Sequence, residues 1–487
     1  MHHFRILSTF LFACVATTQQ PGAPKNEQEL DRQVAQLLVT FARTAETSKL
    51  PSRARMAYEQ ILDHYDIENA AARAGLGWKK VKGEWQQGPV DKLPADAATT
   101  PQRNAVTTAW VTTRKRAAAL HRELGIALFA TEERTRGVTQ FERALWFDPD
   151  DVKSHEALGH VAFEGFYGTE EQVACAQRRR AILAKAQEVT AMEPTIEALT
   201  PNFMPGELKP AGIEFHGARG KHVTFWAADP RLAVLHAVWA ERAVAMLDFL
   251  WPAERKSRLD YFPIQVRWVV VVRDEAERDR LLEACPVTTG GSTLSAAKTY
   301  GGCAFKAAAG QAEWIMHTPG SEDDSAVGLI AKRCNPAFES GCSEGLVHTL
   351  TYLLCGTVKA RYFIPATRAA GGKDELDRDP TAWLKHIRQL AETEADAPLV
   401  HMVRERMERF REPVRAKAWT FVMFLLARHP DTWPALMRSV GADNQTEEEV
   451  ATAFRTALQR EWAEVDAEWR SWVRVGSRYG MASGLPQ

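Results

Sequence analysis

The feature that most constrains the fold of this sequence is a regular spacing of small and bulky residues in its first third. Over a period of about 34 residues, small positions allow two antiparallel helices to approach closely, and bulky positions fill the space between them. The positions are Leu124, Gly125, Leu128, Gly137, Phe141, Ala144 and Pro149. Leu158-Gly159 follows Leu124-Gly125 after one such period. The pattern predicts stacked helix pairs, because a single pair cannot bury its open face.

A more divergent copy of this pattern precedes it. Tyr58-Glu-Gln-Ile61-Leu62 stands before Leu76-Gly77 much as Phe141-Glu-Arg-Ala144-Leu145 stands before Leu158-Gly159. Each copy then continues with a second glycine and an aromatic residue at the same spacing, which are Gly83 and Trp85 in the first and Gly165 and Tyr167 in the second. We therefore expect helical repeats over residues 23–192, with a loop or insert at 86–105.

These repeats resemble tetratricopeptide repeats. The resemblance implies an all-α module, and stacks of this kind usually bind a protein or peptide along one face. The alternative is that two or three repeats only pack against the rest of the chain. With 61 basic and 62 acidic residues, the formal net charge is -1. Such a chain has no overall field that would attract nucleic acid or an anionic membrane, so we expect no nucleic-acid partner.

Residues 1–22 are predicted to be an export signal. A short polar start containing Arg5 is followed by an apolar run from Ile6 to Ala16, which is too short to span a bilayer. We expect an exported protein: periplasmic, a membrane-anchored lipoprotein, or secreted. Leu11-Phe12-Ala13-Cys14 resembles a lipobox, which would make Cys14 a possible lipid anchor. In the alternative, Cys14 is an apolar residue of the signal and cleavage occurs near Ala16.

Export changes how the cysteines are interpreted. Without Cys14 an even number remains, namely Cys175, Cys285, Cys303, Cys334, Cys342 and Cys355. Disulfides persist outside the cytoplasm, and Cys334–Cys342 is the candidate local bridge. Buried free thiols are the alternative. A structural zinc site is disfavoured because the sequence has no CxxC pair.

A proline-rich stretch at 193–215 is the predicted linker to a second domain at 216–475, with a tail at 476–487. Strands are expected at 222–226, 264–272, 300–305 and 312–316, and a long helix at 232–250. From Asp324 onward the pattern is helical. The predicted fold class is therefore α+β: helical repeats, then a domain with a small mixed sheet and a mostly helical C-terminal half.

The second domain resembles the peptidase-MA-like family of gluzincin metallopeptidases. Ser343-Glu344-Gly345-Leu346 resembles the family's SEGLA helix. The resemblance extends through an aromatic C-terminal run at 418–426, 453–454 and 462–473, whose stripes we otherwise interpret as core. It implies a zincin-like fold in which a preceding helix carries HExxH. The two histidines of that motif bind zinc, its glutamate activates water, and the later glutamate completes the site.

The chain departs from that motif. On the helix before Glu344, the positions of ligand, base and ligand hold Gly328, Leu329 and Lys332. A second register, His348-Thr349-Leu350-Thr351-Tyr352, keeps one histidine but has threonine at the base position and tyrosine at the second ligand position. Threonine cannot accept a proton near neutral pH, and tyrosine has a pKa of about 10. We therefore predict a pseudo-peptidase with no catalytic residues and no cofactor.

Two residues remain candidates for a metal. Glu344 and His348 are four apart and share one helical face, so they could hold zinc if His222, His317 or another group joined them. The alternative is a helix N-terminal carboxylate with a histidine one turn later. His155-Glu156-Ala157-Leu158-Gly159-His160 resembles the HExxGH helix of the dipeptidyl-peptidase III family. We expect no zinc there, because its histidines are about 140° apart on an ideal helix.

The leading hypothesis is an exported, non-catalytic protein that binds a protein or peptide partner in the cell envelope. Its repeats, or the former substrate cleft of the degenerate peptidase-like domain, would form the binding surface. The alternative is a zinc metallopeptidase with an altered site around Glu344 and His348. A third possibility is a structural envelope protein without a cleft function.

Overall fold

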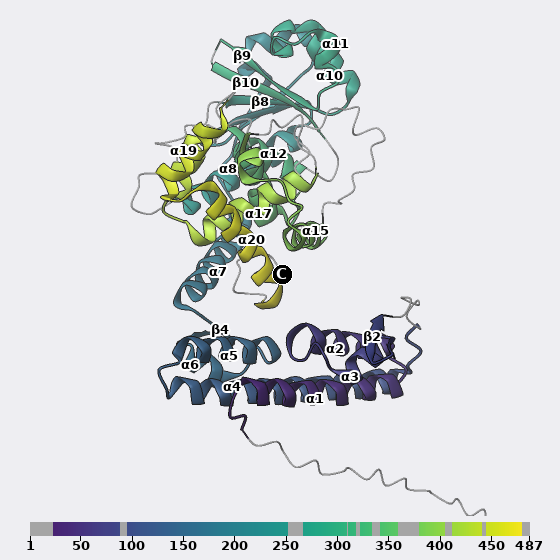
Figure 1. The fold of residues 1–487 in the computed structure, drawn as a ribbon. Coiled ribbons are helices and arrows are strands. Elements are labelled where there is room, and N and C mark those ends of the chain that lie inside the picture. Colours follow the sequence, from purple (N-terminus) through teal and green to yellow (C-terminus); the bar gives the residue numbers. More distant parts are fainter. Residues whose placement is uncertain are drawn as a thin grey trace, which may run out of the picture. The chain divides into compact units, whose positions relative to one another are not determined.

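The computed structural model describes residues 23–87, 95–251, 266–308, 310–317, 322–333, 341–358, 379–404, 412–440 and 445–479. The predicted export signal with Cys14, and the predicted tail beyond Tyr479, lie outside the described residues. The fold is mixed α+β, as predicted, with about 66% helix and small sheets (Figure 1). Among the helices within these ranges, none has the length and apolar character needed to cross a membrane.

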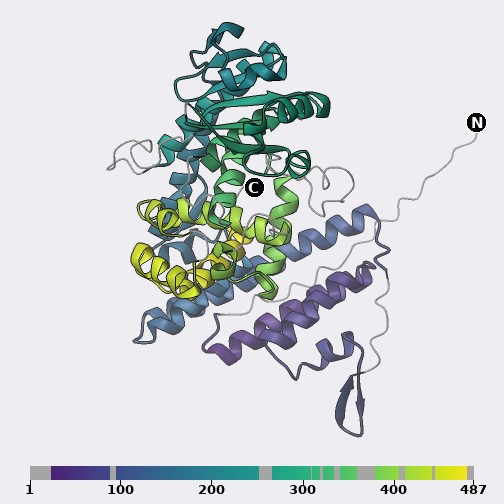
Figure 2. The same ribbon diagram turned by 90° about the horizontal axis from the view of Figure 1, so that it is seen from above.

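The chain divides into two compact units, Met1–Thr169 and Glu170–Gln487. The first unit contains the same series of elements twice. The first series is α1 (Glu27–Thr47), α2 (Pro51–His64), α3 (Ala70–Gly75) and a hairpin of β1 (Trp78–Val81) and β2 (Glu84–Gln87). The second is α4 (Thr100–Phe129), α5 (Arg134–Phe147), α6 (Val152–Ala157) and a hairpin of β3 (Val161–Phe163) and β4 (Phe166–Gly168). The long helices α1 and α4 lie side by side (Figure 2).

Small residues bring the helices of the second pair together. A Cβ atom on Gly125 would lie 3.0 Å from the Phe141 ring, and one on Gly137 would lie 2.3 Å from the Phe129 ring. Where α4 and α5 cross, a side chain at position 137 would clash with the Phe129 ring, and one at position 125 would press on the Phe141 ring. In the first pair, the equivalent buried residues Ala42 and Ala54 leave room for the close contact of α1 and α2.

Gly159 does not have the role that the 34-residue spacing predicts. It follows α6 with a φ of +69°, and nothing lies within 4 Å of a Cβ atom placed on it. Gly77 has the same position after α3, with a φ of +82°. Both glycines end a short helix in the left-handed region, where a Cβ is unfavourable. Gly159 is thus equivalent to Gly77 and not to the packing residue Gly125.

The unit boundary differs from the predicted one at residue 192. Helix α7 (Glu170–Ala191) contacts α8, α13 and α17, and its residues Ile182, Ala186 and Val189 belong to the core of the second unit. The predicted linker at 193–215 is also part of that unit. It contains β5 (Glu197–Leu199) and two 3-10 helices, Pro201–Phe203 and Gly206–Ala211. Prolines suit the first positions of such helices, so the richness in proline marks turns within a fold.

The second unit has a six-stranded sheet with the order β5-β6-β7-β8-β10-β9. Its other strands are β6 (His216–Arg219), β7 (Thr224–Ala227), β8 (Val266–Val272), β9 (Gly302–Ala307) and β10 (Gly310–Met316). The central strands β7, β8 and β10 are parallel, and the remaining pairs are antiparallel. Val269 and Val271 of β8 face one core, whereas Trp268, Val270 and Val272 face another, so β8 is buried on both sides.

Helices form the rest of this unit. The helices α8 (Pro230–Leu250) and α10 (Glu275–Ala284) follow β7 and β8, with a 3-10 helix at Pro286–Thr289 and α11 (Leu294–Ala297) before β9. After β10 come α12 (Glu322–Arg333), α13 (Gly341–Cys355), α15 (Pro380–Thr393), α16 (Leu399–Arg404), α17 (Glu412–Arg428), α18 (Trp433–Ser439), α19 (Glu447–Leu458) and α20 (Trp462–Tyr479). Helix α13 packs between α12 and α17, and almost all its residues are buried.

Candidate functional site

The candidate site lies on α13, at its contacts with α12 and α17. Gly345 marks the contact with α17, because a Cβ atom on it would lie 2.2 Å from the carbonyl oxygen of Ala418. The glycine of the predicted Glu-Gly pair therefore permits two helices to approach. It also fixes the preceding residue, Glu344, beside the first turns of α17.

Glu344 lies among cationic and ionisable side chains. The Nε2 atom of His348 is 3.5 Å from its Oε1 atom, and Nε of Arg415 is 3.8 Å from the same oxygen. The exposed fractions of the three side chains are 12% for Glu344, 1% for His348 and 15% for Arg415. Lys332 of α12 is also buried. The cluster is thus a largely dehydrated group of charges.

The balance of charges keeps Glu344 ionised. Burial alone would raise the pKa of its carboxyl group, but the contact with His348 and the positive charges of Lys332 and Arg415 outweigh burial. The pKa of Glu344 is therefore held well below its usual range. The protein's own side chains therefore compensate the charge of this carboxylate.

The helix α12 brings only one of the three predicted motif positions to this carboxylate. Lys332 is near enough for its charge to act on Glu344. Leu329, at the position of the general base, is fully buried and belongs to the apolar core of the unit. Gly328, at the first ligand position, is buried as well. These residues provide a cation and apolar surface, but neither a base nor a metal ligand.

The second register does not form a ligand set either. The Thr349 hydroxyl donates a hydrogen bond of 2.8 Å to the carbonyl of Gly345, one turn earlier. The Tyr352 ring packs on Trp419, with 5.5 Å between centroids, and burial raises the pKa of its hydroxyl. His348 packs edge-on against Trp383 at 5.0 Å. The three side chains are engaged in different contacts.

The two histidines proposed as additional ligands are placed elsewhere. His222 Nδ1 lies 2.6 Å from a carboxylate oxygen of Glu241, and the His222 backbone N–H donates to the other oxygen at 2.8 Å. His317 follows β10, where its backbone N–H donates to Val272. Within the part of the chain that the structure describes, no three His, Cys, Asp or Glu side chains form a group that could hold a metal ion.

The HExxGH-like segment has a role in the repeated fold of the first unit. Nε2 of His155 lies 2.7 Å from the carbonyl oxygen of Pro149, and its Nδ1 lies 2.7 Å from Nδ1 of His160. The His155 ring stacks on Tyr167 of the hairpin, with 4.8 Å between centroids. His155 thus fixes the hairpin to the end of α6.

Arg73 makes the same set of contacts in the first copy. Its Nε donates to the carbonyl oxygen of Ile67 at 2.8 Å, and its guanidinium lies 5.3 Å from the Trp78 ring and 5.9 Å from the Trp85 ring. Arg73, Trp78 and Trp85 precede His155, His160 and Tyr167 by the same number of residues. Arg73 and His155 are therefore equivalent, which gives the His155 segment a structural explanation.

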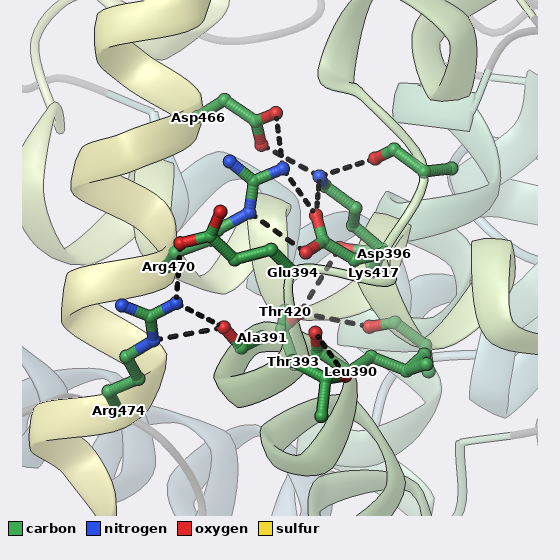
Figure 3. A network of polar contacts seen from close by, with 12 residues as sticks. Leu390, Ala391, Thr393, Glu394, Asp396, Lys417, Thr420, Asp466, Arg470 and Arg474 are labelled. Carbon is green, nitrogen blue, oxygen red and sulfur yellow. Dashed lines mark hydrogen bonds and ion pairs between the residues drawn. The ribbon is translucent and has the colours of Figure 1, made fainter.

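The same unit contains a second buried ionic network, which the sequence did not predict (Figure 3). Lys417 of α17, which is fully buried, bonds Asp396 and lies 2.7 Å from Asp466 of α20. Arg470 donates to Asp396 at 2.8 Å. Burial would raise the pKa of Asp396, but Arg470 and Lys417 outweigh it and lower that pKa. The sequence indicated only the apolar residues around this network, because its members are far apart in the chain.

Charged contacts at the end of α12 were likewise not predicted. Arg333 donates two hydrogen bonds, of 2.5 and 2.6 Å, to the carboxylate of Glu313 on β10, and both residues are buried. This pair joins the sheet to the helix that carries Lys332. The adjacent Lys332-Arg333 was the signal in the sequence, but only the fold shows which carboxylates they meet.

The predicted disulfide between Cys334 and Cys342 stays a prediction. Cys342 is buried and forms no disulfide with another described cysteine, and burial raises the pKa of its thiol to about 12. Its predicted partner, Cys334, lies outside the described residues. Cys355 likewise forms no disulfide with another described cysteine, and Cys175, Cys285 and Cys303 are free thiols.

The first unit contains a groove of about 580 Å³. Helix α1 contacts both α2 and α4, which hardly contact each other. Side chains from all three helices and from the segments before α2 and α4 line the groove. They are Phe41, Leu50, Ser52, Arg53, Met56, Asp96, Arg103, Val106, Thr107 and Trp110.

Comparison with known proteins identifies no relative: no family model, no curated protein and no solved structure matches this chain.

Proposed function

We propose that this chain is an exported, non-catalytic protein with a degenerate peptidase-like domain, and that it binds a protein or peptide partner in the cell envelope. The observation that carries the proposal is that α12, which packs on α13, holds the buried Lys332 near enough for its charge to act on Glu344. A gluzincin has a metal-binding histidine where Lys332 stands. A lysine ammonium group at that position neutralises the carboxylate and repels a divalent cation.

The order of elements supports the assignment of these positions. Helix α12 follows β10, a parallel strand in the interior of the sheet, and it packs on α13. The resemblance requires this sequence of strand, metal helix and Glu-bearing helix. Leu329 in the core adds a second reason, since no proton acceptor occupies the position of the general base.

Binding is the activity that such a chain retains. The groove of the first unit is concave, partly apolar and large enough for side chains of a ligand. The former substrate cleft is the other possible surface. A peptidase-like core does not depend on metal ligands alone, so the domain can keep its shape after catalysis is lost.

Metal analysis of the purified chain tests the loss of the site. The protein is prepared without chelators and its zinc content is measured by mass spectrometry, together with Glu344→Ala and the surface control Glu214→Gln. We expect no stoichiometric zinc in any of them. One equivalent of zinc in the wild type and the control, lost in Glu344→Ala, would contradict the proposal.

Glu344 and His348 keep the alternative of a metallopeptidase with an altered site open to test, because they lie 3.5 Å apart on one face of α13. Cleavage of unfolded casein by the pure chain, abolished by 1,10-phenanthroline and restored by zinc, would establish that alternative. We expect no cleavage above the background of Glu344→Ala.

A further inference from the structure

The first half of α4 is poorly covered by the unit to which it belongs. In this helix, which the structure describes throughout, Val106 is the one buried residue of Thr100–Arg116. From Ala117 onward, by contrast, residues of the same helix enter the core. The exposed half also contains many threonines and valines, whose branched side chains favour helix only weakly. Neither burial in the core nor helix propensity explains why the first half of α4 forms a helix.

This half-helix is strongly basic. The sequence has no acidic residue from Ala97 to Arg122, and four basic ones lie in the exposed half, at Arg103, Arg114, Lys115 and Arg116. Over the whole chain, by contrast, 61 basic and 62 acidic residues nearly balance. A local positive potential beside a groove favours a partner with negative charge.

The groove beside this half-helix combines apolar and cationic surface. Phe41 and Trp110 lie at 4.6 Å between ring centroids, and Met56 also lines the groove. Arg53 on α2 and Arg103 on α4 line it from two different helices. An apolar side chain of a ligand would be buried against the rings, and a carboxylate would meet the guanidinium groups.

The acidic residue in the groove has another role. Asp96 accepts hydrogen bonds from the backbone N–H of Ser52 at 3.2 Å and from its hydroxyl at 2.6 Å. These bonds lower the pKa of Asp96 and satisfy the start of α2, where Leu50 provides no side-chain cap. No ion pair of Arg53 or Arg103 with an acidic residue is seen in the described part of the chain. Arg103 donates a hydrogen bond of 3.3 Å to the carbonyl oxygen of Ala98, and the charges of both arginines act on Asp96, but neither guanidinium is held in a salt bridge there.

We propose that this groove binds an acidic amphipathic segment of a protein, with its apolar side chains against Phe41 and Trp110 and its carboxylates on Arg53 and Arg103. The inference rests on the proposed binding function and specifies the site and the chemistry of the partner. The apolar lining favours a peptide over a nucleic acid, whose phosphates would use the arginines but not Met56 or Val106.

Fluorescence anisotropy with a defined probe tests the assignment. The probe is a fluorescein-labelled peptide of sequence EELLEELFEELLEE, and the comparison peptide has lysine at every glutamate. The full chain is titrated as wild type, as Arg53→Glu/Arg103→Glu, as Trp110→Ala, and as the control Arg32→Glu/Arg134→Glu. The control makes the same change of charge at exposed arginines outside the groove.

We expect the acidic probe to bind, with an affinity that falls as salt increases, and the lysine peptide not to bind. Both groove variants should weaken binding at least tenfold, whereas the control should change it less than threefold. Circular dichroism melting verifies that each variant is folded. The assignment is overturned if the probe does not bind, or if the groove variants bind it as the control does.

Two further outcomes separate this inference from its premise. If a single-stranded oligonucleotide binds more tightly than the peptide, and the same groove variants weaken its binding, the partner is a nucleic acid and not a peptide. If an envelope protein binds wild-type and groove-variant chains equally, the groove is not the binding site, but the proposed binding function stands. Stoichiometric zinc that is lost in Glu344→Ala would instead contradict the proposed non-catalytic function. The result of the peptide measurement would then hold independently of that function.

Discussion

At the scale of single residues, the position of one cation changes what Glu344 can do. A carboxylate in a metal site must leave its lone pairs to the ion. Here the contact with His348 and the positive charges of Lys332 and Arg415 keep it ionised despite its burial. Such a cluster costs desolvation energy, and removing one partner leaves the others uncompensated. We therefore treat Glu344 as a structural charge in the present chain.

This assignment predicts the pH dependence of a Glu344→Gln variant. Because the folded-state pKa of Glu344 is depressed, its stabilising contribution is present above the ordinary pKa of about 4.3 and is lost as the pH falls through the folded value. At pH 7 the variant should lose about 3 kcal/mol of unfolding free energy. The difference from wild type should shrink progressively below pH 4.

Urea unfolding of both proteins between pH 7 and pH 3 measures this difference. Glu214→Gln is the matched control, because the Glu214 side chain is largely exposed, and it should change the free energy by less than about 0.5 kcal/mol. A loss in Glu344→Gln that stays constant down to pH 3 would show that the pKa of Glu344 is not lowered in the folded state.

Gly345 gives a second prediction at this scale. Its hydrogen faces the Ala418 carbonyl, and a Cβ atom there would lie at 2.2 Å, so α13 and α17 would have to separate. Gly345→Ala should therefore reduce the unfolding free energy by about 1–3 kcal/mol. Gly206→Ala is the control, since a Cβ atom on Gly206 meets nothing within 4 Å and its φ is ordinary. Equal stability of the two variants in urea would rule out the close helix contact.

At the scale of elements, the network around Lys417 joins helices that are far apart in the sequence. Lys417 of α17, Asp466 and Arg470 of α20, and Asp396 before α16 contribute to it (Figure 3). Lys417 Nζ also lies 4.4 Å from the centre of the Trp469 ring, which suits a cation. The network compensates charges that apolar packing alone would leave buried and unpaired.

Replacing Lys417 with methionine should therefore destabilise the second unit, although methionine is apolar and of similar length. The change leaves Asp396 and Asp466 close to each other without the ammonium group between them, and we expect a loss of about 3 kcal/mol in urea unfolding. Lys209→Met removes an exposed lysine and should have no measurable effect. A near-neutral Lys417→Met would mean that Arg470 alone compensates both carboxylates.

The elements also show what the sequence could predict. The duplication was visible because Gly77 and Gly83, like Gly159 and Gly165, need positive φ values and so keep their spacing. The strands of the sheet were visible because β8 alternates and then becomes wholly apolar. The residues 197–211 were taken for a linker because proline-rich turns resemble linkers locally, and only pairing with β6 distinguishes them.

The candidate site was predictable only in part. Glu344, His348 and Lys332 lie on two helices that are close in the sequence, and a known motif suggested that they meet. Arg415 and the groove residue Asp96 reach their partners through tertiary packing, which no local pattern records. Gly159 was assigned the wrong role because the same residue type serves both close packing and left-handed turns.

At the scale of the whole molecule, each unit has a core of its own. One apolar cluster is formed by residues between Leu30 and Phe147, and two others by residues from Ile182 onward. Cores that are separate in this way unfold as separate cooperative units. We therefore expect calorimetry of the full chain to show two transitions.

A buried histidine allows one of these transitions to be assigned. His121 is fully buried in the first unit, between the Tyr65 hydroxyl at 3.2 Å and the Gln140 side-chain oxygen at 2.8 Å, with Arg143 near it. Burial lowers its pKa to about 4, with the charge of Arg143 acting in the same direction. The folded unit thus resists a proton that the unfolded chain accepts below pH 6.5.

The sign of this effect follows from proton linkage. Because the folded pKa is the lower one, stability is fully present above pH 6.5 and is lost between about pH 6.5 and pH 4, by about 3 kcal/mol in all. His121→Gln removes the titrating group while keeping a polar side chain, so its transition should depend less on pH in this range. The other transition should be unchanged by the substitution at every pH. A variant that shifts both transitions equally would show that the two units unfold as one.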